Sequence, residues 1–183
     1  DADAYPGRSS EIRGQSPAAD LPGTKIGETA YNYQTNDNLH DRIWYDPATG
    51  TVHTNWMYGD IAETPLFPNR RMYYNFFDGN QWTHGQGIPI EIADRAGYGS
   101  LVVDANNIAV PTSHYTGDRQ INAWYDFQPG FGFFTQSPIF VHEDGIAPMW
   151  PDITIDSKDI WHVTSTQDNQ EETSTLINGV NDN

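Results

Sequence analysis

Acidic side chains beside amides give the sequence its clearest candidate for a metal site. Asp104 and Asn106 share one short polar segment, and Asp156 and Asp159 share a second. Carboxylate and amide oxygens are the ligands that Ca²⁺ prefers. The same residues also form Asx turns, in which a side-chain oxygen accepts hydrogen bonds from the following backbone. Neither segment has EF-hand spacing, so the sequence fits both calcium binding and an ion-free turn.

Aromatic side chains are the second candidate for ligand binding. They make up 13% of the residues, and the faces of Trp and Tyr rings stack on sugars and other flat apolar surfaces. We single out Trp56, Trp82 and Trp124 as candidates for stacking on a glycan. The alternative is that these rings fill the core between packed sheets.

Catalytic patterns are weak. A sialidase-like glycosidase would need an arginine cluster for the substrate carboxylate, a tyrosine nucleophile and an acid. Asp78 and Asp126 occupy equivalent places in two similar segments, which indicates a structural role such as capping a turn. The sequence holds no G-x-S-x-G motif, no HExxH motif and no Cys. We therefore predict no catalytic residue and no cofactor other than calcium.

A repeated hairpin carries these residues. Three short apolar or β-branched runs end in Asp, at 43–46, 101–104 and 153–156. A polar turn and a second strand follow each Asp, which is typical of a β-hairpin. His53 and His162 fall at the same place in two of the second strands, which favours a framework role over metal binding.

Further similarities extend each hairpin. Segments 71–78 and 120–126 each end in two aromatics and an Asp and predict a third strand, and 88–92 and 138–142 predict a fourth. Residues 26–34 add one candidate strand, and 59–69 predict a short helical turn or a long loop. Four strands repeating about every 50 residues are typical of a β-propeller.

The predicted fold is all-β, with four-stranded antiparallel blades in an incomplete propeller of about three blades. The units span approximately 43–92, 101–142 and 153–177, and a β-sandwich is the alternative. Residues 1–25 are predicted to be an extended Pro/Gly-rich arm, and 26–183 the propeller-like domain. Because three blades leave open sheet edges, we expect a homo-oligomer or filament in which the arm lies across a neighbour's edge. A fragment of a longer propeller is the other interpretation.

The charge balance excludes several partners. With 25 acidic and 9 basic residues the net charge is −16, which argues against binding to nucleic acid and to anionic membrane surfaces. No apolar run approaches the roughly 20 residues that cross a bilayer, so we predict no membrane insertion. The absence of Cys excludes a disulfide scaffold.

Two segments resemble the repeats of secreted bacterial β-propeller proteins. They are Ile26–Asn36, which leads into Arg42 and Ile43, and Gly50–Gly59. The resemblance covers residues 26–170 and is to sialidase-like (BNR-type) propellers of the kind exported with C-terminal sorting domains. It implies export and a propeller fold, without implying a particular reaction.

Together these observations predict a non-enzymatic extracellular module with a structural or adhesive role. It would self-associate, as an oligomer or surface filament, or dock to an extracellular partner such as a glycan. The alternative is a glycan-binding or sialidase-like glycoside hydrolase fragment. Because the chain begins with Asp1 rather than Met, we expect a protein of the cell surface or exterior whose signal peptide has been removed.

Overall fold

The computed structural model describes residues 23–35, 41–91, 95–115, 120–137, 148–167 and 176–181. They form antiparallel strands and one short 3-10 turn, η1 (Ile61–Glu63), inside the segment predicted to hold a helical turn. The all-β prediction is therefore confirmed. Within this part of the chain, no helix is long and apolar enough to span a membrane.

The strands form three antiparallel sheets, which we number in chain order. The first sheet contains β1 (Ile43–Asp46), β2 (Thr51–Tyr58), β3 (Arg71–Phe77) and β4 (Ile88–Pro89), in that order. The second sheet contains β5 (Ala96–Gly97), β6 (Leu101–Val103), β7 (Ala109–Tyr115), β8 (Ile121–Asp126) and β9 (Phe134–Gln136). In this sheet β7 pairs with β5, β6 and β8, and β8 pairs with β9. The third sheet contains β10 (Pro148–Ile155), β11 (Trp161–Gln167) and β12 (Leu176–Asn181).

The predicted hairpins are the pairs β1–β2, β6–β7 and β10–β11. The predicted third strands are β3 and β8. In the first sheet β4 is the fourth strand, as expected. In the second sheet β9 pairs with β8, whereas the predicted fourth strand at 138–142 lies outside the described residues.

The predicted strand at 26–34 is wrong, because these residues do not form a strand. The segment is joined to the first sheet by one backbone hydrogen bond, from Ala30 N to Gly59 O (2.9 Å). Side chains make other connections, such as Asn75 Nδ2 donating to Ile26 O (2.8 Å). These bonds attach the segment to the first sheet without a β-ladder.

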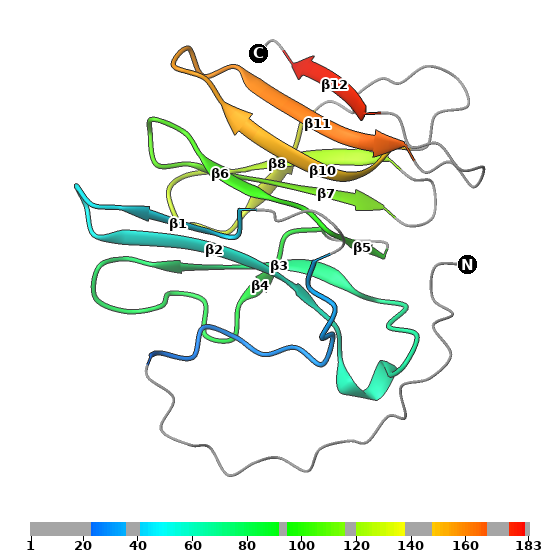
Figure 1. Ribbon diagram of the computed structural model, residues 1–183. Helices are drawn as coiled ribbons and strands as arrows, with labels where there is room; N and C mark the ends of the chain where they lie inside the picture. Colours follow the sequence, from blue (N-terminus) through cyan, green and yellow to red (C-terminus); the bar gives the residue numbers. More distant parts are fainter. Residues whose placement is uncertain are drawn as a thin grey trace.

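The three sheets stack in chain order, with the second sheet between the other two (Figure 1). One core cluster joins the first two sheets and includes Met57, Met72, Tyr74, Leu101 and Trp124. A second joins the second and third sheets and includes Val102, Val110, Ile121, Ile153 and Trp161. Successive residues of the second sheet thus face different cores, as alternation along a strand requires. This arrangement is consistent with propeller-like blades and with a sandwich.

Candidate functional site

Aromatic side chains gather on the loop that joins β8 to β9. Phe127, Phe131 and Phe133 are 67%, 54% and 60% exposed, and the rings of Phe127 and Phe131 lie 5.9 Å apart. Large apolar side chains that cluster at a surface mark a binding surface more often than scattered ones do. The loop is therefore the first element of a candidate site.

Asp126, at the end of β8, fixes the shape of this loop. Its buried carboxylate accepts hydrogen bonds from Gly132 N (2.9 Å to each oxygen) and from Phe133 N (3.1 Å). Burial raises the pKa of Asp126, and these backbone donors oppose that rise. The backbone closes the loop through Phe127 N, which donates to Phe133 O (3.0 Å).

The glycines of the loop allow its close approach to the first sheet. Gly130 and Gly132 have φ angles of 66° and 77°, in the region that glycine adopts without strain. A Cβ at Gly130 would clash with the ring of Phe76. His84 Nε2 lies 2.9 Å from Gly130 O. The loop is thus fixed by Asp126 within its own hairpin and by His84 from the first sheet.

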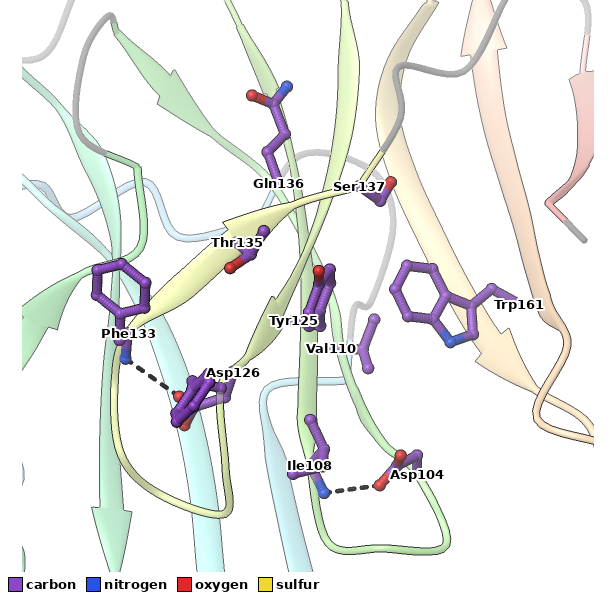
Figure 2. A pocket seen from close by; sticks show the side chains of 11 residues that line it. Asp104, Ile108, Val110, Tyr125, Asp126, Phe133, Thr135, Gln136, Ser137 and Trp161 are labelled. Atoms are coloured by element: carbon purple, nitrogen blue, oxygen red, sulfur yellow. Dashed lines mark hydrogen bonds between the residues drawn. The ribbon is translucent and has the colours of Figure 1, made fainter. Parts of the chain in front are cut away.

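The loop borders a cavity of about 890 Å³ between the second and third sheets. Figure 2 shows Trp161 extending from β11 toward Tyr125 of β8, and the two ring centroids lie 6.4 Å apart. Apolar and polar groups share the lining, and the polar ones include Asp104, Thr135, Gln136 and Ser137. The Tyr125 ring is 39% exposed, whereas Trp161 is buried. The Tyr125 ring can stack on a sugar face while the neighbouring hydroxyl and carboxylate groups form hydrogen bonds with the sugar hydroxyls.

The residues predicted to bind calcium lie in two equivalent hairpin turns. Asp104 Oδ1 accepts hydrogen bonds from the backbone N–H of Asn106 (2.9 Å) and Ile108 (2.7 Å). Asp156 Oδ1 accepts from Lys158 N (2.8 Å) and Ile160 N (3.1 Å). Both are therefore Asx turns.

These turns give the carboxylates a structural role without an ion. The described part of the chain holds no group of three or more His, Asp or Glu side chains arranged to bind a metal. Calcium at Asp104, Asn106, Asp156 or Asp159 stays a prediction. Asp104 enters the candidate site as a wall of the cavity.

The three tryptophans predicted to stack on a glycan lie apart from the cavity lining. Trp124 is 5% exposed and belongs to the core between the first and second sheets. Trp56 is half-buried, with its ring against the backbone of Gly27 and Gly87. Trp82 is also half-buried and packs 5.5 Å from the ring of Phe77.

Sequence reasoning missed the aromatic loop. The signal was present in residues 127–134, where four Phe alternate with Pro129, Gly130 and Gly132. Large apolar residues between turn-forming residues predict apolar side chains on a loop, where little can cover them.

Comparisons with known proteins identify the fold and no family. No family model and no curated protein matches the sequence. Two solved structures of a polysaccharide lyase of family PL25, an ulvan lyase, superpose with TM-scores of 0.54 and 0.50 at 13% and 12% identity. They cover 75% and 78% of this chain, and the chain spans only 31% and 32% of theirs. The first holds -[GlcA(1-4)Rha3S]-.

A fucose lectin from Kordia zhangzhouensis in complex with methyl-fucoside superposes with a TM-score of 0.46 at 12% identity, over 75% of this chain and 90% of the lectin. At such low identity the lyase structures show a shared β-rich fold and nothing more. Of what the resemblance to secreted propellers implied, only a β-rich fold is supported, and no family model for sialidase-like repeats or for a C-terminal sorting domain matches.

Proposed function

We propose that this chain is a carbohydrate-binding module of an extracellular protein and that the glycan occupies the cavity between the second and third sheets. The observation that carries this proposal is the anchored β8–β9 loop, which presents Phe127, Phe131 and Phe133 to solvent beside a cavity with polar walls. A preorganised surface loses little conformational entropy on binding. The fold shared with a polysaccharide lyase supports a carbohydrate ligand in general, without favouring a charged or a neutral one.

Binding, rather than hydrolysis, is the proposed activity. Glycoside hydrolysis uses two carboxyl groups, one as acid and the other as base or nucleophile. The two carboxylates that line the cavity, Asp104 and Asp126, each accept two or more hydrogen bonds from backbone N–H groups. These bonds hold both groups in turns, so the proposal gives neither carboxylate the role of acid, base or nucleophile.

The test is a glycan array followed by calorimetry with the glycan that binds best. Tyr125→Ala and Phe133→Ala remove rings from the cavity wall, and each ring contact is worth about 0.5–1.5 kcal/mol. We expect each variant to bind up to about tenfold more weakly. Leu66→Ala is the matched control, because Leu66 is another exposed apolar residue, located after η1 in the first sheet's loop. Unchanged affinity in both variants, or no glycan bound by the wild type, would overturn the proposal.

Self-association is a second candidate, and strand β1 favours it. β1 lies at the edge of the first sheet, and its Ile43, Trp44 and Tyr45 are 67%, 42% and 59% exposed. An apolar edge strand can pair with another chain. We propose a second copy as its partner, with the arm at 1–25 lying across that edge; residues 1–22 lie outside the described part.

Light scattering after size-exclusion chromatography tests this second proposal. We expect the wild type to form a dimer or a larger assembly that Trp44→Lys disperses, because a charge on an edge strand opposes pairing. Leu66→Lys introduces the same charge at another exposed apolar position and should leave the assembly intact. A wild-type protein of 20.6 kDa in solution, the mass of one chain, would contradict self-association.

A further inference from the structure

We infer that the cavity selects a neutral glycan and discriminates against sugars that carry carboxylate or sulfate groups. This inference rests on the proposed function and narrows it.

The charged groups in the cavity wall are all acidic. Asp104 and Asp126 line the cavity, and its lining contains no Lys or Arg. The chain as a whole carries a net charge of −16. An anionic sugar would therefore approach like charges with no cation in the wall to offset them, and like-charge contacts at a binding surface are strongly unfavourable.

The described arginines lie elsewhere. Arg71 lies in β3, Arg70 just before it, and Arg42 just before β1. Arg95, between β4 and β5, donates from Nε to Phe67 O (3.2 Å). Arg70 is buried between the rings of Tyr31 and Tyr98, with its guanidinium 4.8 and 4.7 Å from the ring centroids. Its Nη1 donates to the Tyr31 hydroxyl (2.7 Å). Arg70 therefore packs against Tyr31 of the segment at 23–35 and is not located where it could bind an anion in the cavity.

The remaining wall groups suit hydroxyl groups. Asp104 Oδ1 accepts the two backbone bonds of its turn, and Oδ2 accepts one long bond from Asn106 Nδ2 (3.5 Å). A carboxylate oxygen can accept a second hydrogen bond, so Oδ2 can also accept from a ligand hydroxyl, and hydrogen bonds to a carboxylate are the stronger kind. Thr135 adds a hydroxyl that both donates and accepts. Tyr125 offers its ring face and its own hydroxyl. Sugar hydroxyls satisfy all of these groups, whereas a sugar carboxylate can only accept.

Matched polymer pairs test the selection directly. We propose native affinity electrophoresis in dextran against dextran sulfate, and in methyl-esterified against de-esterified galacturonan, together with the neutral and anionic members of the glycan array. At about 10 mM salt we expect neutral members to be retained and anionic ones to bind at least about tenfold more weakly. The difference in affinity between neutral and anionic polymers should become smaller at about 0.5 M salt, because salt screens charge repulsion.

A pair of matched variants tests whether Asp104 is the group that weakens the binding of anionic sugars. Asp104→Asn removes the charge and keeps an oxygen for the turn. Asp78→Asn is the control, because the Asp78 carboxylate also accepts from two backbone N–H groups, those of Asn80 (2.8 Å) and Gln81 (2.9 Å), in a turn that follows β3. We expect Asp104→Asn to improve anionic binding by about fivefold, roughly the effect of one charge a few ångströms away. Asp78→Asn should leave it unchanged.

The outcomes separate this inference from the proposed function. Anionic members bound as tightly as neutral ones, through a site that Tyr125→Ala disrupts, would overturn the charge selection and leave carbohydrate binding in place. Equal effects of Asp104→Asn and Asp78→Asn would also overturn it. No binding to any glycan would overturn both.

Discussion

Replacing Glu91 with Gln should stabilise the protein at pH 8 and change its stability little at pH 5. Glu91 is 0% exposed, and its Oε2 accepts a hydrogen bond from Met72 N (2.9 Å). Burial raises the pKa of Glu91 from 4.5 to about 7, against the opposing effects of Ser113, the Met72 N–H and Arg71. The glutamine keeps an acceptor for Met72 N and has no charge to bury.

The magnitude follows from the two pKa values. Because the folded state holds the proton of Glu91 more tightly than the unfolded chain does, stability falls as the pH rises from about 4.5 to about 7. Each unit of pKa difference corresponds to about 1.4 kcal/mol, so the buried carboxylate costs about 3 kcal/mol above pH 7. Glu91→Gln should recover up to that amount at pH 8.

His53 has the opposite pH dependence. It is fully buried, with Nδ1 2.7 Å from the Tyr74 hydroxyl and Nε2 3.1 Å from Asn107 Oδ1. Burial lowers the pKa of His53 from 6.5 to about 4. The unfolded chain therefore takes up the proton first, and His53 lowers the stability of the fold increasingly as the pH falls from about 6.5 to about 4. Between about pH 4.5 and 6.5 the two effects largely cancel, and the wild-type profile should be nearly flat there.

Urea denaturation at half-unit intervals from pH 5 to 8 measures both effects. In Glu91→Gln the contribution of His53 stands alone, so stability should rise with pH up to about 6.5 and then level off. Asp78→Asn removes one surface carboxylate and serves as the control. A Glu91→Gln variant that loses more stability at pH 8 than at pH 5 would refute the reasoning, since it would mean that the ionised carboxylate is favourably paired.

Three further changes probe the loop and the Arg70 contacts. Gly130→Ala forces a Cβ into the ring of Phe76 at positive φ, and should cost about 2 kcal/mol or more by urea denaturation and weaken glycan binding. Asp126→Asn places an amide N–H near the loop donors, and calorimetry should show weaker binding with a loss of about 1–3 kcal/mol in stability. Arg70→Lys removes the bond to Tyr31 and the flat stacking, and should lower the free energy of unfolding by about 1–2 kcal/mol.

The hairpins could be predicted because their signal is local. Asp104 and Asp156 each end a short apolar run, and each turn is closed by hydrogen bonds within five residues of the Asp. Such turns depend on the chemistry of neighbouring residues and not on the rest of the fold. The segment at 26–34 had strand-like composition, yet its backbone partners depend on the first sheet, which composition does not describe.

The candidate site could not be predicted in the same way. Trp124 and Tyr125 are consecutive residues of β8, and their side chains point to opposite faces of the second sheet. Trp124 faces the first sheet and is buried, whereas Tyr125 faces the third sheet and the cavity. Because the second sheet has a neighbouring sheet on each face, its polar residues, such as Thr112 and Asn122, are buried and do not mark a solvent-facing side. Only the stacking of the three sheets determines that Tyr125, and not Trp124, lines the cavity.

The cavity is also a product of two sheets, which limits what any single repeat could reveal. Tyr125 and Thr135 come from the second sheet, and Trp161 comes from the third. The first sheet contributes indirectly, since Phe76 and His84 hold the loop that carries Phe133. Glycan binding should therefore depend on the packing of all three sheets. Asp104 and Asp126 have counterparts in other units, Asp156 and Asp78, yet those counterparts do not line the cavity. The site is therefore defined by how the three sheets stack and not by the repeat itself.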